Sequence, residues 1–290
     1  MTLDCGQDTL GCALAHKAES GESGGVKGTP LAAGEGWRVV DHVCTCGPRD
    51  RPFEERRALA SVSLVLSGTF VCRSRHGETL LSAGSFFLGT AGAPYECSHR
   101  HGEGDRCLSF LFSPEAFEML ARDAGALRTA FGRDGLPPLR AFSGLAARAA
   151  AAMRRPQDFE SIAYALAAAA LQAANDTAPP RTADRHHCRI SNVLRYLETR
   201  TDAAHSIADL AGVARLSPFH FLRTFKQVTG VTPHQWLVRA RLRDAARRLA
   251  DGRERVTDIA LDAGFEDLSN FVRSFRTEFG LSPRSYRAAA

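Results

Sequence analysis

Two cysteines and two histidines that could bind a metal lie close together in the stretch CSHRHGEGDRC. If the chain is extended here, Cys97, His99 and His101 point to one side, because alternate side chains of a strand share a face. Cys107 would return beside them if its strand pairs with the preceding one as a hairpin. Thiolate and imidazole ligands suit zinc or another transition metal. The spacing therefore predicts a metal site built from these four residues.

The same residues allow two other interpretations. Thiolates beside histidine or arginine are reactive, so Cys97 and Cys107 could form a thiol switch. The stretch could also be a polar loop with two buried, inert cysteines, since free cysteine is often buried. Cys44, Cys46 and Cys72 could add ligands, although the CxC spacing alone is a weak signal. Metal binding, redox sensing and a structural role all stay open.

An internal repeat near the C-terminus carries a second chemistry. Residues 221–233 match residues 271–283 at a shift of 50, with Phe, Arg, Phe, Gly and Pro identical. Upstream of the two copies, the apolar residues of 207–214 and 256–263 follow the spacing of a short amphipathic helix. Each copy therefore predicts a helix, a tight turn and a second helix. Units of this kind place the second helix in the major groove of DNA.

Local signals mark the ends of these expected helices. Ser206 with Asp209 resembles a capping box, while Ser217 and Asp267 precede the second helices as N-caps. Between the two units, an apolar stripe from 238 to 249 predicts one long helix. Such a helix would hold the units apart, and successive major grooves on one face of DNA recur about every 34 Å. We therefore expect one chain to contact two successive grooves.

Residues 190–288 resemble the DNA-binding domain of AraC/XylS-type transcriptional regulators. The positions that carry the resemblance lie in both units: Ile207, Ala208, Asp209, Leu210, Ala211, Ser217, Phe225, Lys226, Gly230, Pro233, Arg241, Leu242, Ala245, Asp258, Ile259, Ala260, Gly264, Phe265, Phe271, Arg273, Phe275, Gly280, Leu281, Ser282, Pro283, Tyr286 and Arg287. The resemblance implies that side chains of each second helix contact operator DNA. The residues at these positions are Phe219, His220, Leu222, Arg223, Lys226, Leu268, Ser269, Asn270 and Arg273.

The chemistry of these side chains suggests how they would bind bases. Arg223 and Arg273 could make bidentate bonds to guanine, Asn270 could pair with adenine, and Phe219 could contact thymine methyls. Leu222 and Leu268 are apolar where polar side chains often lie in the family. The alternative for the two arginines is an ion pair with a nearby carboxylate.

The N-terminal two thirds follow a different pattern. Residues 36–112 contain short β-type runs separated by glycine-containing turns, which predicts a small antiparallel barrel or sandwich. Residues 141–174 are rich in alanine and predict two helices interrupted near Pro156, which could form a dimer contact or pack on their own barrel. The expected class is α+β. The resemblance to the family implies a cupin-like barrel that binds an effector and helps the chain to dimerise.

We therefore expect four segments along the 290 residues: a flexible tail (1–34), a cupin-like effector and dimerisation domain (35–178), a linker (179–188) and the DNA-binding domain (189–290). The net charge of +5 is uneven, with +6 on residues 184–290 and −1 on the rest. Excess positive charge on one segment is typical of proteins that bind a polyanion.

The longest apolar run is far shorter than the roughly 20 residues that span a bilayer, and the N-terminus lacks a secretory leader, so we expect a cytoplasmic protein. The expected function is sequence-specific transcription regulation, more often activation in this family, in response to a small-molecule, metal or redox effector. Expected partners are double-stranded DNA, a second copy of the chain and RNA polymerase. The alternative is a metal-dependent cupin enzyme fused to a DNA-binding module, but the usual cupin metal motif is not in its place.

Overall fold

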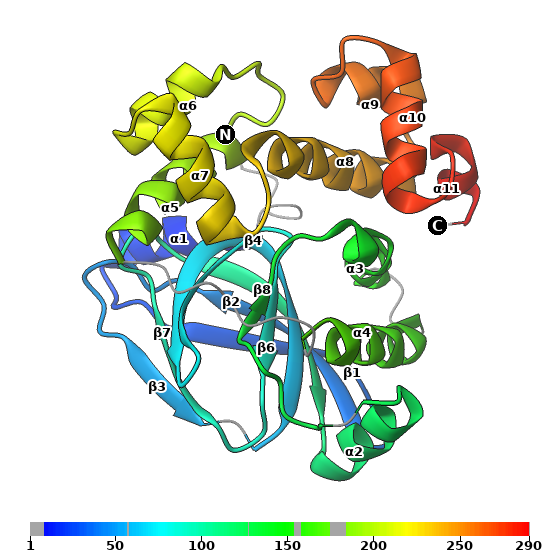
Figure 1. The fold of residues 1–290 in the computed structure, drawn as a ribbon. Coiled ribbons are helices and arrows are strands. Elements are labelled where there is room, and N and C mark those ends of the chain that lie inside the picture. Colours follow the sequence, from blue (N-terminus) through cyan, green and yellow to red (C-terminus); the bar gives the residue numbers. More distant parts are fainter. Residues whose placement is uncertain (1–8, 57, 127, 154–157, 175–183, 290) are drawn as a thin grey trace.

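The computed structural model describes residues 9–289, apart from 57, 127, 154–157 and 175–183 (Figure 1). An antiparallel sheet with three covering helices forms the N-terminal part, and helices alone form the C-terminal part. The expected α+β class is confirmed. None of the described helices combines the length and apolar character that crossing a bilayer requires.

The sheet curves because one long strand belongs to both of its halves. The strands are β1 (Val26–Gly34), β2 (Trp37–Cys44), β3 (Phe53–Arg56), β4 (Ala60–Ser74), β5 (Gly77–Ser82), β6 (Phe86–Gly89), β7 (Pro94–Ser98), β8 (Asp105–Phe112) and β9 (Gly135–Leu136). The first part of β4 pairs with β6 and β8, and its second part pairs with β5 and β7. The two halves share a buried interior, to which β4, β7 and β8 contribute Phe70, Tyr95, Cys97 and Cys107.

The N-terminal segment is not a flexible tail where it is described, so this prediction was wrong. Residues Thr9–Ser20 form α1, and β1 pairs with β2 along its length, from Val26 opposite Cys44 to Gly34 opposite Trp37. The Lys17 ammonium donates to the Thr45 carbonyl at 2.7 Å and to the Asp50 carboxylate at 2.8 Å. The Lys17 hydrogen bond, followed by two backbone N–H donors, lowers the pKa of Asp50 to about 2. Contacts with a distant loop, rather than local sequence, order this segment.

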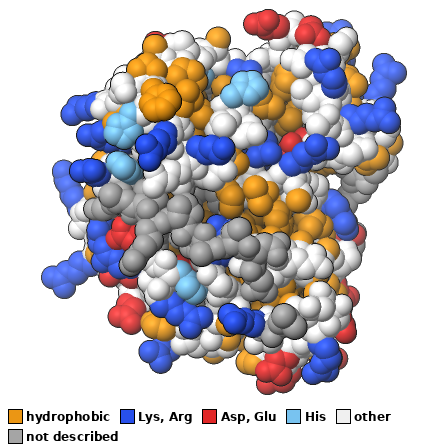
Figure 2. Space-filling view, viewed as in Figure 1, with side chains coloured by type: hydrophobic (Ala, Val, Ile, Leu, Met, Phe, Trp, Pro, Cys, Tyr) orange, Lys and Arg blue, Asp and Glu red, His pale blue; other side chains and the backbone are white. Residues whose placement is uncertain are grey.

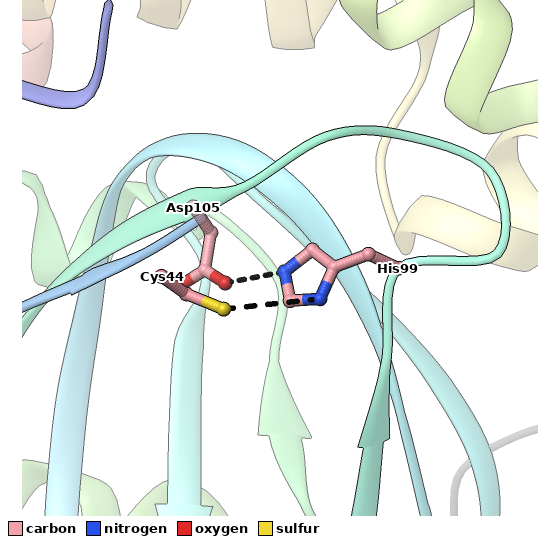
Figure 3. A group of neighbouring side chains, drawn as sticks. All are labelled: Cys44, His99 and Asp105. Atoms are coloured by element: carbon pink, nitrogen blue, oxygen red, sulfur yellow. Dashed lines mark hydrogen bonds and ion pairs between the residues drawn. The ribbon is translucent and has the colours of Figure 1, made fainter. Parts of the chain in front are cut away.

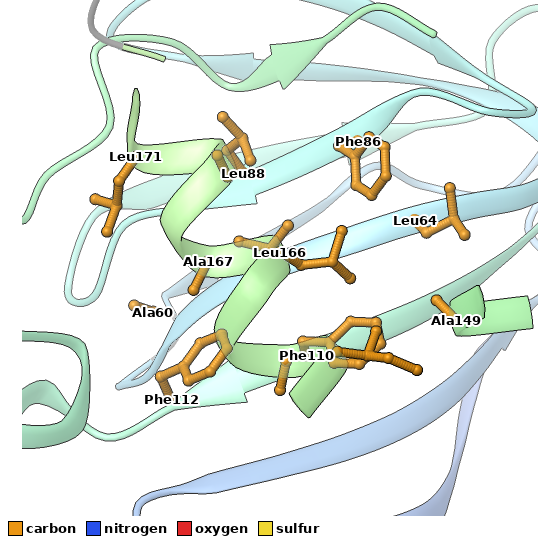
Figure 4. Packing of buried hydrophobic residues seen from close by; sticks show 14 of the residues in the cluster. Ala60, Leu64, Phe86, Leu88, Phe110, Phe112, Ala149, Leu166, Ala167 and Leu171 are labelled. Atoms are coloured by element: carbon orange, nitrogen blue, oxygen red, sulfur yellow. The ribbon is translucent and has the colours of Figure 1, made fainter. Parts of the chain in front are cut away.

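Three helices cover the outer face of the sheet: α2 (Pro114–Asp123), α3 (Arg140–Ala152) and α4 (Phe159–Ala174). The two alanine-rich helices that we predicted are confirmed, while Pro156 between them lies outside the described residues. Ala163, Ala167 and Ala170 are fully buried, and the small side chains let α4 approach the sheet near Phe110 and Leu88 (Figure 4). The helices therefore do pack on their own sheet.

The C-terminal part consists of α5 (Asp184–Glu198), α6 (Ile207–Ala214), α7 (Pro218–Thr229), α8 (Pro233–Asp251), α9 (Val256–Asp262), α10 (Leu268–Phe279) and α11 (Pro283–Ala289). Residues 184–188 were expected in the linker but belong to the first turns of α5, and residues 179–183 lie outside the described part. Helix α5 begins before the predicted end of the linker because His187 is buried. It is buried together with the expected apolar stripe of Ile190, Val193, Leu194 and Leu197.

Helix α8 joins the two parts of the molecule. The Trp236 indole N–H lies 3.4 Å from the Ser82 hydroxyl, and the Arg239 guanidinium donates to the Pro138 carbonyl at 2.8 Å. Arg243 donates to the Ala83 carbonyl at 3.1 Å. A Cβ added at Gly84, whose φ is +87°, would lie 2.5 Å from the Arg243 guanidinium. The turn between β5 and β6 is thus shaped to receive this helix.

Glu198, at the end of α5, makes the stability of this contact depend on pH. Burial raises the pKa of Glu198 to about 7, against the opposing effects of Arg243, the N–H groups of Ala83 and Gly68, and Arg195. The ordinary value is 4.5, so between these pH values the unfolded chain loses a proton that the folded chain keeps. The stabilisation of the folded chain by protonated Glu198 is complete below pH 4.5 and is lost as the pH rises through 7.

Glutamine cannot ionise, so we expect the Glu198→Gln variant not to lose stability in this way as the pH rises. Its free energy of unfolding relative to the wild type should rise by roughly 1–3 kcal/mol between pH 5 and pH 8, since one pKa unit corresponds to about 1.4 kcal/mol. Urea unfolding of both proteins at the two pH values measures the difference. Parallel pH profiles would show that Glu198 ionises normally in the folded chain.

Candidate nucleic-acid interface

The first helix-turn-helix unit consists of α6, a tight turn and α7. The predicted capping box is present: the Asp209 N–H donates to the Ser206 hydroxyl at 3.1 Å, and the Ser206 N–H donates to the Asp209 carboxylate at 3.3 Å. Helix α6 ends at Arg215, whose φ of 52° and ψ of 50° are left-handed. Ser217 precedes α7 as expected, but its side chain accepts no capping hydrogen bond.

The second unit consists of α9, a turn and α10. Asp267 caps α10 by accepting a hydrogen bond from the Asn270 N–H at 2.6 Å. The turn contains Gly264, where an added Cβ would lie 2.4 Å from the Asp202 carbonyl. A left-handed φ of +79° also favours glycine there. The second recognition helix is therefore positioned by a cap and a turn that the sequence predicted.

The predicted interior of each unit is also confirmed. Phe221 and Phe225 are fully buried with ring centroids 5.6 Å apart, and Phe271 and Phe275 repeat this arrangement at the same 5.6 Å. The buried methyl groups of Ala211 and Ala260 belong to the same two apolar cores. Figure 1 shows α7 and α10 at opposite ends of α8. One rigid helix thus presents two equivalent recognition helices.

The nine residues expected at DNA lie on the surface of α7 and α10. All are exposed except Asn270, which is half-buried. Phe219 is 81% exposed, far more than any other large apolar side chain in the described chain. The ring of His220 stands edge-on to His186 of α5, with centroids 6.0 Å apart. Burial, followed by the charge of Arg185, lowers the pKa of His186.

Arg223 and Arg273, the two arginines expected to contact DNA, differ from the arginines of α8 in their partners. Within the described residues, neither Arg223 nor Arg273 has an ion pair to a carboxylate, and a donor of Arg273 lies 3.3 Å from the neutral Asn270 side-chain oxygen. Ser274 also donates to that oxygen, at 3.4 Å. Among the described residues, the alternative of a surface ion pair is therefore not what the structure contains.

The arginines of α8 have structural roles that the sequence did not reveal. Arg241 donates to the carbonyls of Thr201, Ala203 and Gly264 at 2.6, 2.8 and 2.7 Å, so one guanidinium joins the loop before α6 to the turn of the second unit. Arg248 bonds to both Glu254 and Asp262. The carbonyl partners belong to loops, which explains why no charge pattern along the helix could identify them.

Helix α10 also contacts the N-terminal part. Glu278 accepts a hydrogen bond from Ser143 of α3 and lies 3.3 Å from the Arg239 guanidinium. Glu278 lies near the C-terminal end of α10, whereas the positions predicted to contact DNA lie in its first half. The second unit is thus held against α3 while Leu268 and Arg273 remain exposed.

The predicted metal ligands are not brought together as a set. Cys97 faces the apolar interior with Phe87 and Tyr95, whereas His101 lies in the turn that follows β7. The hairpin that we expected to bring Cys107 to Cys97 does not form, because β7 pairs with β3 and β4, and β8 pairs with β2 and β4. This prediction of the ligand set was wrong.

A different group forms around His99 instead (Figure 3). Its Nε2 atom lies 2.7 Å from a carboxylate oxygen of Asp105, and its Nδ1 atom lies 4.0 Å from the sulfur of Cys44. Over the described part of the chain, these three residues are the one cluster of histidine, cysteine and acidic side chains close enough to hold a metal ion. Burial, followed by the charge of Asp105, raises the pKa of the Cys44 thiol.

Comparison with known proteins identifies the class to which the recognition helices belong. Residues 210–289 match the family described as helix-turn-helix domain. The probable transcriptional regulator LumQ of Photobacterium leiognathi is 35% identical over 101 residues, 34% of this chain and 41% of that protein. The transcriptional activator RhaS of Klebsiella pneumoniae is 37% identical over 105 residues, 36% of this chain and 38% of that protein.

The DNA-binding domain of AdpA, solved with a target DNA, is 31% identical with a TM-score of 0.34 and matches 35% of this chain and 91% of that domain. Residues 210–289 therefore carry a helix-turn-helix domain that is similar to those of curated transcriptional regulators, in agreement with the resemblance drawn from the sequence. The chain spans about two fifths of the length of the curated relatives cited here. These relatives are named as regulators, consistent with the expectation that the chain is not an enzyme, and they give no support to a cupin enzyme.

Proposed function

We propose that the protein is a sequence-specific DNA-binding regulator of transcription. The observation that carries the proposal is the pair of recognition helices at the two ends of α8, each with its aromatic face buried and its predicted DNA-contacting face exposed. Phe219, Arg223 and Arg273 provide the apolar and cationic groups that bind thymine methyls and guanine edges. The excess positive charge of this part supports binding to a polyanion.

We further propose that the N-terminal sheet responds to an effector. The turn between β5 and β6 contacts α8 through Ala83 and Gly84, so a change in the sheet would reach the helix that joins both units.

A second copy of the chain is the proposed partner at α3 and α4, where Figure 2 shows hydrophobic side chains gathered on the surface. Tyr164, Ala169 and Ala173 of α4 are only partly buried. RNA polymerase is the proposed target of the bound regulator.

Selection of binding sites from random double-stranded DNA tests the proposal. The full chain should enrich a site with two short motifs about one helical turn apart, as two recognition helices on one face require. DNase footprinting of the enriched site should show protection of both motifs. Enrichment of no sequence, with binding that depends only on salt, would reject sequence-specific regulation.

A further inference from the structure

The tight turns of the two helix-turn-helix units have the same backbone but different residues. Each contains one left-handed residue, Arg215 with a φ of +52° and Gly264 with a φ of +79°. The N–H that follows each of them donates to an alanine carbonyl five residues earlier, to Ala211 at 3.0 Å and to Ala260 at 3.1 Å. Arg215 and Gly264 therefore occupy equivalent places in the two units.

Arginine is an unusual residue for such a place. A left-handed backbone crowds the Cβ atom against the following carbonyl oxygen, and glycine alone avoids this strain. Over the described residues, Arg215 is the one residue other than glycine with a positive φ. Strained residues of this kind are found where a side chain has a function. The guanidinium of Arg215, rather than the turn itself, is what the arginine contributes.

In the second unit, the chain itself fills the corner beside this turn. The Arg241 guanidinium donates to the Gly264 carbonyl and to two carbonyls of the loop before α6. Arg189 of α5 has the place that Arg241 has in α8, because each directly precedes an apolar stripe of the same spacing. The stripes are Leu242, Ala245, Ala246 and Leu249 in α8 and Ile190, Val193, Leu194 and Leu197 in α5.

In the first unit, the same corner is open and positively charged. A hollow of about 600 Å³ lies between α5 and the end of α6, and Arg185, Arg189 and Arg215 line it as a basic corner. Arg185 and Arg215 are exposed, and Arg189 is half-buried. Within the part of the chain that the structure describes, none of these three guanidinium groups has an ion pair with a carboxylate. The basic corner is therefore available to an anionic partner.

The basic corner adjoins the start of the first recognition helix. His186, next to Arg185 on α5, packs its ring edge-on against His220 in the first turn of α7, with centroids 6.0 Å apart. Burial, followed by the charges of Arg185, His220 and Arg189, lowers the pKa of His186, so positive groups gather here. A phosphate backbone borders each side of the major groove, and a helix that enters the groove brings its flanks close to those phosphates.

We propose that Arg185, Arg189 and Arg215 bind the phosphate backbone of DNA beside the first recognition helix. The planar fork of arginine suits paired hydrogen bonds to phosphate oxygens. Phosphate contacts fix the position of a protein on the duplex and carry no base preference. The proposal rests on the proposed function, because it requires α7 to lie at DNA. It adds an asymmetry, since the equivalent corner of the second unit is filled by Arg241 and its loop.

The salt dependence of DNA binding by the full chain tests this proposal. Counterion release makes log K fall with log salt concentration by about 0.9 for each phosphate contacted. Arg185→Gln, Arg189→Gln and Arg215→Gln should each reduce this slope by about 0.9, and the triple variant by about 2.7. The reductions should be equal on the selected operator and on a random-sequence duplex, as expected for phosphate contacts. Unchanged slopes in all four variants would overturn the proposal.

Arg195→Gln is the matched control, because it removes an arginine from the same helix on the side of the N-terminal part. The Arg195 Cδ atom lies 3.5 Å from the position that a Cβ at Gly102 would take. This variant should keep the wild-type slope. An equal reduction in Arg195→Gln would show that total charge, and not the basic corner, sets the salt dependence, and would overturn the proposal.

Arg215→Gly separates the side chain from the turn. Glycine fits the left-handed backbone, as Gly264 does in the second unit, so urea unfolding should show no loss of stability. The slope should still fall by about 0.9, because the guanidinium is removed. Lower stability together with a wild-type slope would assign Arg215 to the fold, and would remove it from the proposed contact.

Neutral methylphosphonate linkages, placed one at a time along the operator, locate the contacted phosphates. At these positions the neutral linkage should weaken binding of the wild type but not of the triple variant. A wild type that selects no sequence, while its variants lose salt dependence on random DNA, would reject the proposed function and retain the basic corner. Specific operator binding with unchanged slopes would retain the function and reject the basic corner.

Discussion

Replacing Arg273 with alanine is expected to weaken operator binding by about 5- to 150-fold, the equivalent of roughly 1–3 kcal/mol, and to relax base preference at one position. The guanidinium is exposed on α10, and its hydrogen-bonded neighbour Asn270 is uncharged. An exposed guanidinium on a recognition helix can bond both acceptors on the major-groove edge of guanine. The variant should fold normally because no ion pair to a carboxylate within the described chain is lost.

Arg273→Lys is the matched control for this experiment. Lysine keeps the charge but lacks the planar fork, so it should keep attraction to phosphates and lose discrimination between bases. Fluorescence anisotropy against the operator and its single-base variants, over a range of salt concentrations, measures both effects. A uniform loss of affinity on every sequence, with a shallower salt dependence, would instead assign Arg273 to a phosphate contact.

The helix-turn-helix units could be predicted because their determinants are local. The Ser206 cap acts within one turn, Gly230 and Gly280 end helices through their own left-handed backbones, and Phe225 and Phe275 repeat at a fixed shift. Each signal lies within a few residues of the element that it specifies. A repeated set of such signals determines both the units and the surface that they expose.

The errors in the N-terminal part arise where distant residues decide the structure. Strand β1 is largely exposed and shows no apolar alternation, so only its pairing with β2 reveals it. The ligand set was wrong for a similar reason. Cys44 lies 55 residues from His99 in sequence, and the register that places Cys44 opposite Asp105 brings them together. Nearness to His99 in sequence had favoured Cys97 as a ligand. Cys97 lies in β7, which pairs with β3 and β4 and not with β8.

Two phenylalanines on α7 should separate folding from recognition. Phe225 is fully buried in the core of the first unit, so Phe225→Ala should lower the free energy of unfolding by about 3–5 kcal/mol. Phe219 lies on the same helix and is 81% exposed, so Phe219→Ala should change stability by less than about 0.5 kcal/mol. The two substitutions remove the same atoms from opposite faces of one helix. Urea unfolding of both variants measures this difference.

Phe219→Ala should instead weaken operator binding by about 1 kcal/mol or more, because its ring is placed to pack against a thymine methyl group. Replacing each operator thymine in turn with uracil, which lacks that methyl, identifies the contact. At the contacted position, uracil should weaken binding of the wild type but not of Phe219→Ala, since the methyl group and the ring act only through each other. If the affinity lost through uracil and the affinity lost through Phe219→Ala add at every thymine, Phe219 contacts no methyl group. The exposed ring would then bind a different partner.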